Sequence, residues 1–465
     1  MEATNTANRY QTIAAIATAS GMAGIGIIRL SGPDALTIAS RLFPNHSWED
    51  HPHAKLHLAK IINTDGSILD EVLVAVFRAP HSYTGEDLVE INAHGSSFIL
   101  TEILHLLLSA GAELAQPGEF TQRAFLNGKM DLSQAEAVAD LIHSTNAVQH
   151  RYAINQMKGG IRDQIAGLRR KLVDFASLIE LELDFSEEDV EFANRDHLLA
   201  LLTEINLRIN QLINSFELGE AVRHGIHTVI AGKPNAGKST LLNALLGEER
   251  AIVSDIPGTT RDTIEEQLNI NGIVFRLVDT AGIRDTEDMI EASGVQRTLR
   301  SIEQSSILIY VADLGAVSSQ SLSNELLPIV QDGQEVVLVA NKYDLYPGVR
   351  LSSLSNSLVK PENIIPLSAL HGTGLETLRS KLFELASHRH SLQEFSVLIN
   401  ARHRAILGRA REALHTVEAG LLSGLQTDLV AQSLREGIYE LGQVSGEVSS
   451  DELLGNIFGK FCIGK

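Results

Sequence analysis

The sequence is poor in cysteine and has no long apolar run. Cys462 is the only cysteine among 465 residues, which excludes a disulfide within the chain and a cysteine-based zinc site and fits a reducing cytoplasm. No stretch of about 18 apolar residues occurs, so we expect no membrane-spanning helix. The opening segment "MEATNTANRYQ" is polar and shows no secretory signal. These absences predict a cytoplasmic protein with no membrane partner.

Basic residues are also scarce. The chain has 38 lysines and arginines against 58 aspartates and glutamates, a formal net charge of −20. A protein that holds nucleic acid mainly through its own surface normally carries a basic excess. A role on nucleic acid would therefore require a local basic patch or a basic partner.

A chain of this length predicts about two to four domains. The sequence divides into four segments that show three patterns of apolar residues. Residues 1–128 alternate short apolar runs such as "EVLVAVFRAP" with turn signals, which predicts an α+β domain. We expect the glycine-rich "GMAGIG" at 21–26 to be a turn. Residues 129–224 and 387–465 have a helical period, whereas residues 225–386 alternate Val- and Ile-rich runs with amphipathic segments. The pattern predicts a doubly wound α/β domain inserted into a discontinuous helical domain.

Apolar stripes support the two helical segments. The first stripe is Ile161, Ile165, Leu168, Leu172, Phe175 and Ile179, and the second is Ile406, Ala410, Leu414, Val417 and Leu421. Spacings of this kind put each set on one helix face. They favour bundle-like core packing over a cofactor-binding stripe.

The stretch "GKPNAGKS", Gly232 to Ser239, matches G-x-x-x-x-G-K-[ST] between a predicted strand at 227–231 and a predicted helix starting near Lys238. In this arrangement backbone N–H groups surround nucleotide phosphates, and the helix N-terminus adds its dipole. Lys238 would place a cation on the β- and γ-phosphates, and Ser239 would offer an oxygen to Mg²⁺. Since a chance glycine-rich turn would not need this strand and helix, we predict a nucleotide-binding P-loop.

Later stretches identify the nucleotide as GTP. The Asp344 carboxylate in "NKYD" can accept hydrogen bonds from the N1–H and 2-amino group of guanine, donors that adenine lacks. "LSA" at 367–369 is similar to the loop that backs the base in GTPases. "DTAG", Asp279 to Gly282, would place a carboxylate near Mg²⁺ and a glycine near the γ-phosphate, and "GTTRD" at 258–262 would supply Thr260 to the metal. These motifs, in this order, predict a Ras-like GTPase domain.

One position departs from Ras-like GTPases, in which a glutamine after D-x-x-G orients the attacking water. Here that place is taken by Ile283, whose side chain can neither donate nor accept a hydrogen bond. Hydrolysis must use another group, and Asp285, Glu287 and Asp288 are acidic residues nearby. The positive charge of an arginine finger must also be replaced, because the transition state of phosphoryl transfer requires it.

Through its whole length the chain resembles the MnmE (TrmE) family of tRNA-modifying GTPases. The resemblance rests on "GIGIIRLSG" and "YTGEDLVEINAHG" near the start, "PGEFTQRAFLNGKMDLSQAEAVADLI" at 117–142, the inserted GTPase domain and the terminal "CIGK". It implies a homodimer formed through the N-terminal domain, which acts on tRNA with a flavoprotein, MnmG, in a heterotetramer. The implied reaction modifies C5 of the wobble uridine of certain tRNAs with a one-carbon unit carried by a tetrahydrofolate derivative.

The resemblance also implies metal sites and a catalytic acid. K⁺ held by Asn235, Ser254, Ile256 and Thr259 would pair the GTPase domains across the dimer, activate hydrolysis and replace the arginine finger. Mg²⁺ would be held by Ser239 and Thr260. Glu291, twelve residues after Asp279, would assist hydrolysis, with Lys238 as the second catalytic residue.

For the folate, the resemblance implies binding by Arg29, Glu90, Lys129 and Lys465. The cationic side chains suit an anionic ligand, and a carboxylate can accept hydrogen bonds from the donor-rich pterin edge. Without the family, Arg29 and Glu90 read as ordinary surface residues. The residues expected to contact GTP are Asn235, Ala236, Gly237, Lys238, Ser239, Thr240, Ser254, Asp255, Ile256, Pro257, Gly258, Thr259, Thr260, Asp279, Thr280, Ala281, Gly282, Asn341, Lys342, Asp344, Ser368 and Ala369.

Two other function classes stay open beside a tRNA-modifying GTP hydrolase. A regulatory or ribosome-assembly GTPase would modify no base, but such proteins usually carry basic RNA-binding appendages, which this acidic chain does not show. A scaffold with an inactive nucleotide site conflicts with the intact Lys238, Ser239 and Asp279.

The terminal "FCIGK" places Cys462 fourth from the end, where a prenylated cysteine would stand. Prenylation motifs do not end in lysine, and the residue before Lys465 is a glycine where an aliphatic residue is usual. We therefore expect no lipid anchor but a tail folded back towards the N-terminal domain. Lys465 would contact the ligand, and Cys462 is either a catalytic thiol or a neighbour of the folate without a part in bond-making.

Overall fold

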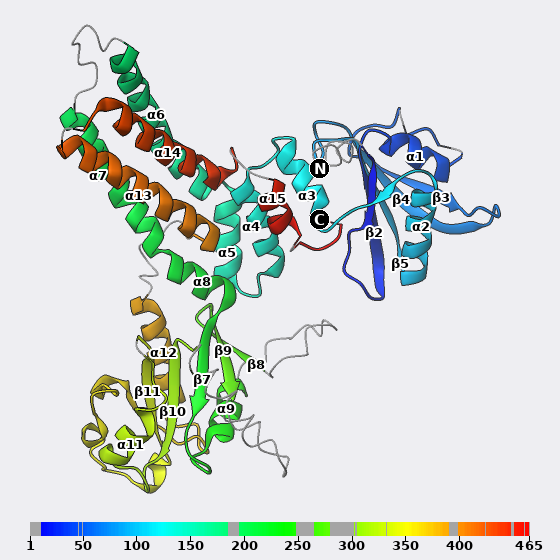
Figure 1. Cartoon of the computed structure of the whole chain (residues 1–465). Coiled ribbons are helices and arrows are strands. Elements are labelled where there is room, and N and C mark those ends of the chain that lie inside the picture. Colours follow the sequence, from blue (N-terminus) through cyan, green and yellow to red (C-terminus); the bar gives the residue numbers. More distant parts are fainter. Residues whose placement is uncertain are drawn as a thin grey trace. The chain divides into compact units, whose positions relative to one another are not determined.

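A computed structural model of the chain describes residues 11–44, 46–48, 50–184, 195–247, 265–279, 302, 305–331, 333–389, 399–423, 425–447, 451–459 and 461–464. The chain divides into two compact units, and Figure 1 labels their helices and strands. One contains the residues up to His143, Ile154–Asn206 and Ile406 onward, and the other contains Ser144–Ala153 and Leu207–Ala405. Within the described ranges, no helix is both long and apolar enough to cross a membrane. The residue borders predicted for the four segments stay predictions.

The N-terminal part of the first unit is an α+β domain, as predicted. Its elements are β1 (Ile13–Ile16), β2 (Ala23–Ser31), α1 (Ala35–Leu42), β3 (Leu56–Ile62), β4 (Ile68–Phe77), β5 (Leu88–Gly95), α2 (Ser97–Ser109), β6 (Glu113–Leu114) and α3 (Glu119–Leu126). The strand order is β3-β4-β5-β2-β1-β6, with only β6 parallel to its neighbour. Alternate side chains of β4, among them Val72 and Val74, share a buried core with Leu36 of α1 and Ile103 of α2.

The turn predicted for "GMAGIG" is wrong from residue 23 onward, because β2 begins at Ala23. Packing leaves little space at Gly26: a Cβ there would lie 2.5 Å from Cδ1 of Leu100 on α2, so the leucine side chain would have to shift. The pairing of β2 with β5 is irregular between Ala23 and Gly26. The glycine at position 26 therefore lets a helix approach a strand, a reason that a local reading of the sequence does not reveal.

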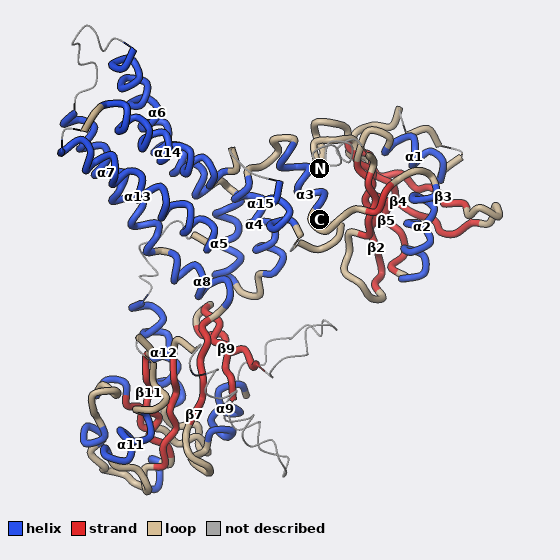
Figure 2. Tube along the Cα trace, in the orientation of Figure 1, coloured by secondary structure: helices blue, strands red, loops and turns tan. Residues whose placement is uncertain are grey.

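Helices make up the rest of the first unit and continue into the second. They are α4 (Leu132–His143), α5 (Ala147–Met157), α6 (Gly160–Asp184), α7 (Arg195–Asn214), α8 (Phe216–His224), α13 (Ala401–Ser423), α14 (Thr427–Ser445) and α15 (Asp451–Phe458). α6 and α14 lie side by side (Figure 2), with an ion pair of 2.8 Å between Glu180 and Arg435. The predicted stripe of α6 is buried, and that of α13 is buried except for the half-buried Leu421. The discontinuous helical domain is thus confirmed.

The residues between α8 and α13 in the sequence form a second sheet. Its elements are β7 (Ile226–Ala231), α9 (Lys238–Leu246), β8 (Glu265–Ile270), β9 (Ile273–Asp279), β10 (Ile307–Asp313), α11 (Ser319–Leu326), β11 (Glu335–Asn341), β12 (Ile364–Pro366) and α12 (Leu375–Arg389), with short 3-10 turns at Tyr343–Leu345, Leu351–Leu354 and Pro361–Asn363. The order is β12-β11-β10-β7-β9-β8, parallel except for β8. Leu241 of α9 and Leu378 of α12 belong to one buried cluster on the sheet, and Leu322 of α11 belongs to another. Helices pack on both faces, which confirms the doubly wound fold.

Candidate functional site

The P-loop connects β7 to α9 as its sequence predicted. Gly232 and Gly237 have φ values of +148° and +99°, in the region that glycine adopts without strain. A Cβ at Gly232 would lie 2.2 Å from the carbonyl oxygen of Val311, and one at Gly237 would lie 2.2 Å from Nδ2 of Asn341. Both glycines therefore let the loop lie against the carboxyl ends of β10 and β11, the edge at which ligands bind in open α/β sheets.

Lys238 begins α9 and reaches back over the P-loop. The residue is 9% exposed, and its ammonium donates hydrogen bonds to the carbonyls of Gly232 at 3.0 Å and Lys233 at 2.9 Å. Asn235 and Ser239 are exposed, and Asn235 adopts φ +61°. The loop thus presents one fixed cation with an amide and a hydroxyl oxygen at its surface, donors that suit phosphates and hard metal ions.

Asn341 joins three of the predicted nucleotide-binding segments. Its Nδ2 donates to the carbonyl of Ala236 at 2.7 Å, and its Oδ1 accepts from the backbone N–H of Ala369 at 3.0 Å. Asn341 is buried, so these bonds are shielded from water. The P-loop, "NKYD" and "LSA", which lie far apart in the sequence, meet at one side chain.

The two charged residues of "NKYD" have different partners. Lys342 forms an ion pair of 2.6 Å with Asp313 at the end of β10, and this hydrogen bond holds the pKa of the Asp313 carboxyl below its usual range. Asp344 lies 3.8 Å from Nε2 of His371. Ser368 is buried, and its backbone N–H donates to the carbonyl of Thr373 at 2.9 Å. Lys342 thus supports the "NKYD" loop through Asp313, whereas Asp344 is exposed.

Asp279 ends β9 in register with Ile230 of β7, so "DTAG" begins beside the start of the P-loop. The other predicted residues of this region lie outside the described residues. They are Ser254, Asp255, Ile256, Pro257, Gly258, Thr259, Thr260, Thr280, Ala281, Gly282 and Glu291. Their roles stay predictions.

Two predicted folate residues are partners across neighbouring strands. Arg29 of β2 stands opposite Glu90 of β5, and its Nε donates to the carboxylate at 2.8 Å. The guanidinium also lies over the ring of Tyr83, 5.4 Å from its centroid. Burial raises the pKa of the Tyr83 hydroxyl, which is hydrogen-bonded to Thr121 of α3 at 2.8 Å. About one fifth of each ion-pair side chain is exposed, so both can reach a ligand.

Lys129 is attached to the loop that carries Tyr83. Its ammonium donates to the carbonyl of Pro80 at 2.9 Å, and Nδ2 of Asn127 donates to the carbonyl of Thr84 at 2.8 Å. Arg29 and Lys129 therefore both contact this loop, and Glu90 is held by Arg29, whereas Lys465 lies outside the described residues.

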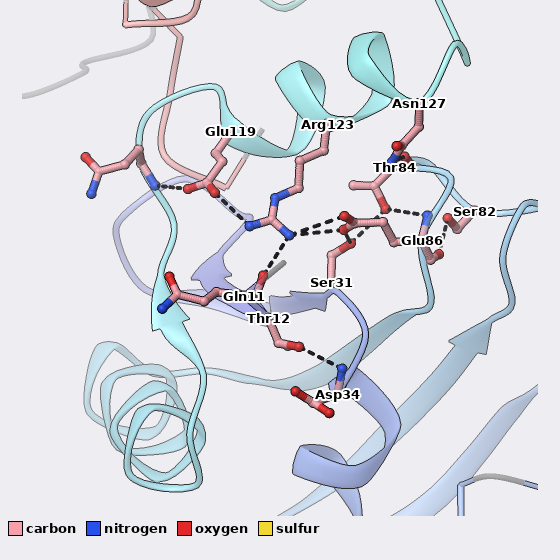
Figure 3. Close-up of polar contacts among 11 residues, drawn as sticks. Gln11, Thr12, Ser31, Asp34, Ser82, Thr84, Glu86, Glu119, Arg123 and Asn127 are labelled. Atoms are coloured by element: carbon pink, nitrogen blue, oxygen red, sulfur yellow. Dashed lines mark hydrogen bonds and ion pairs between the residues drawn. The ribbon is translucent and has the colours of Figure 1, made fainter. Parts of the chain in front are cut away.

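Sequence reasoning missed the buried arginine that holds this region together. Arg123 of α3 is 6% exposed and donates to Glu119 at 2.8 Å, to Glu86 at 3.2 Å and to the carbonyl of Gln11 at 2.8 Å (Figure 3). Glu86 also accepts from Ser31 of β2 at 2.8 Å. The signal was available for three of these residues, since Glu86 lies in "YTGED" and Glu119 and Arg123 lie in "PGEFTQRAF". The pairing itself needs the fold.

The C-terminal tail lies against the N-terminal domain, as its sequence predicted. The carbonyl of Cys462 accepts from the backbone N–H of Gly118 at 3.3 Å, and a Cβ at Gly464 would lie 2.3 Å from the carbonyl oxygen of Ile16. Ile16 pairs with Ile28, the residue before Arg29. The Cys462 side chain is exposed. The tail therefore passes close to the strand that carries the predicted folate arginine.

Known proteins resemble this chain over its whole length. A family model described as the MnmE helical domain matches residues 132–462, and one described as the GTP-binding protein TrmE N-terminus matches residues 12–129. A tRNA modification GTPase MnmE of Cytophaga hutchinsonii is 48% identical over 465 residues and covers 100% of both chains. One of Bacteroides thetaiotaomicron is 48% identical over 465 residues, which are 98% of this chain and 99% of that protein. With these matches and an assembled P-loop domain, the chain belongs to the MnmE (TrmE) family of tRNA modification GTPases and is a GTP hydrolase that acts in tRNA modification.

Proposed function

We propose that this chain is a K⁺-stimulated GTPase that modifies C5 of the wobble uridine of certain tRNAs. It does so with a flavoprotein partner, MnmG, and with a one-carbon unit carried by a tetrahydrofolate derivative. The observation that carries the proposal is that the chain's tail lies beside the strand of the Arg29–Glu90 pair, in the same polypeptide as the P-loop. This arrangement supports a site for a charged small ligand in the N-terminal domain beside the GTPase site.

The P-loop supports GTP hydrolysis with Mg²⁺ and K⁺. The exposed hydroxyl of Ser239 and amide of Asn235 are oxygen donors of the kind that both ions accept. Lys238 would hold the β- and γ-phosphates, and a monovalent cation near Asn235 would supply the charge that an arginine finger supplies elsewhere. Thr260, Ser254, Ile256 and Thr259 are proposed to complete the two metal sites, and Glu291 to assist the attacking water.

GTP turnover should rise severalfold when Na⁺ is replaced by K⁺, and Asn235→Ala should erase this difference. Because Asn235 adopts φ +61°, alanine also introduces backbone strain. Asn235→Gly is the matched variant, since it removes the amide and keeps the conformation. Turnover is measured by phosphate release at constant ionic strength. Equal wild-type rates in the two salts, or a K⁺ effect that survives both substitutions, would remove the proposed K⁺ site.

The N-terminal domain supports the folate part of the proposal. The Arg29 guanidinium, between the Glu90 carboxylate and the Tyr83 ring, is held in one orientation and suits a carboxylate-bearing ligand with an aromatic ring. Lys129 adds a second cation, hydrogen-bonded to the loop that carries Tyr83. Lys465 is proposed as a further contact, and Cys462 as a thiol near the one-carbon unit.

An apolar area on the N-terminal sheet supports a homodimer. Leu58 of β3 and Leu73 of β4 are paired neighbours, and they are 62% and 41% exposed, with Leu56 61% exposed on the same strand. Neighbouring exposed leucines of this kind would be covered if this face of the sheet joined a second copy of the chain. The first proposed partner is therefore a second copy of the chain.

The second proposed partner is the flavoprotein MnmG. Because the net charge of this chain is −20, the flavoprotein would hold most of the tRNA backbone. Since the proposed substrate is tRNA, the proposed location is the cytoplasm.

A further inference from the structure

The start of helix α5 meets the turn of the β8–β9 hairpin within the second unit. A Cβ at Gly272, in that turn, would lie 2.3 Å from Cγ2 of Val148, so the helix and the turn touch with no room for a side chain. Gly272 also has φ +89°, and Asn271 before it has φ +51°, as a tight two-residue hairpin turn requires. Two segments more than a hundred residues apart in the sequence are thus in direct contact.

The helix side of this contact is fixed. The side chain of Asn146 accepts from the backbone N–H groups of Val148 at 3.0 Å and Gln149 at 2.9 Å, which caps α5. Buried Gln149 accepts from the backbone N–H of Thr145 at 2.7 Å and donates to the carbonyl of Arg223, at the end of α8, at 3.3 Å. We therefore expect a displacement of the turn to be passed to the helix through these bonds.

The hairpin side is also held by regular hydrogen bonding. β8 and β9 pair without a break from Glu265 opposite Val278 to Ile270 opposite Ile273, and Oδ1 of Asn269 accepts from the N–H of Gly272 at 2.9 Å. At about 3.4 Å per residue the strands span roughly 20 Å. β8 starts shortly after "GTTRD", and β9 ends in the aspartate of "DTAG". The end of the hairpin away from Gly272 is thus joined to both segments proposed to respond to the γ-phosphate.

We propose that Val148 is a positioning residue through which the β8–β9 hairpin transmits the nucleotide state to α5. α5 runs from Ala147 to Met157, and its last carbonyl accepts from the side chain of Gln134 on α4 at 2.8 Å. Since α5 begins in the second unit and ends in the first, its displacement carries the signal along the chain towards the N-terminal domain. The inference rests on the proposed roles of "GTTRD" and "DTAG".

Val148→Ala removes the contact from the helix side, and Gly272→Ala disturbs it from the turn side. Val173→Ala is the matched helix control, because Val173 lies on α6 and is 38% exposed. Gly66→Ala is the matched turn control: Gly66 has φ +83°, and a Cβ there would meet nothing within 4 Å. Each full-length protein is studied by hydrogen exchange with GDP and with GDP plus aluminium fluoride, both with Mg²⁺ and K⁺. GTP turnover and tRNA modification with the flavoprotein are measured in parallel.

In the wild type, amides of residues 147–157 should exchange at least about fivefold differently between the two nucleotide states. Val148→Ala and Gly272→Ala should abolish most of that difference and slow tRNA modification by about fivefold or more, with GTP turnover within about twofold of wild type. Both controls should match the wild type. The inference is overturned if α5 shows no difference in the wild type, if Val148→Ala keeps the difference, or if GTP turnover falls as far as modification does. A wild type that shows the exchange difference and hydrolyses GTP but modifies no tRNA would instead contradict the proposed function.

Discussion

Replacing Lys238 by alanine is expected to lower GTP turnover by about 100- to 1,000-fold, because removal of one preorganised charge from a transition state has effects of this size. The ammonium is held within the loop by the carbonyls of Gly232 and Lys233 at 3.0 and 2.9 Å. No large side-chain rearrangement is then required before it meets the phosphates. Single-turnover hydrolysis at saturating GTP separates this effect on chemistry from an effect on binding.

Lys233→Ala is the matched control in the same loop. Its ammonium-bearing side chain is 63% exposed and pairs with Glu325 at 2.6 Å instead of the loop carbonyls. Exposed ion pairs contribute up to about 1 kcal/mol, so turnover should change by no more than about fivefold. If Lys233→Ala and Lys238→Ala lowered turnover equally, the special role of Lys238 would be wrong.

Asp344→Asn is expected to weaken GTP binding by at least about 100-fold, since two hydrogen bonds to a charged acceptor are together worth about 3–6 kcal/mol. An asparagine offers one acceptor and one donor edge. It therefore matches xanthine, which has a carbonyl where guanine has its 2-amino group. Asn341 and Ala369 hold this loop by backbone and amide bonds that the substitution leaves in place.

Affinities for GTP and xanthosine triphosphate, measured for both proteins, test the assignment. The wild type should prefer GTP, and Asp344→Asn should prefer xanthosine triphosphate. Glu376→Gln removes a carboxylate that is 81% exposed on α12 and should leave the preference unchanged. A uniform loss of affinity for both nucleotides in Asp344→Asn would mean that Asp344 supports the loop and does not read the base.

Sequence patterns predicted the structure correctly where it depends on residues that are close together in the sequence. "GKPNAGKS" was placed correctly between a strand and a helix because its glycines and its flanking apolar runs are adjacent in sequence. The buried stripe from Ile161 to Ile179 followed from helical spacing alone. The doubly wound fold followed from the alternation of strands with helices.

Contacts between distant segments could not be predicted in the same way. Arg123 reads as a surface residue of a short helix, yet Glu86 and Gln11, far away in the sequence, make it the centre of a buried network. Gly26 reads as part of a turn because nothing nearby shows that Leu100 needs its space. The meeting of Val148 and Gly272 depends on how α5 packs in the second unit. In each case a contact with a residue far away in the sequence determines the role of the position. Sequence spacing does not identify that residue.

The central claim is that the GTPase serves chemistry on a tRNA base. Nucleoside mass spectrometry of bulk tRNA from cells that lack the protein tests it most directly. Aminomethyl-type groups at C5 of wobble uridines should be lost, return with the wild-type gene and stay absent with Lys238→Ala. An unchanged nucleoside profile in the deleted cells would contradict the account.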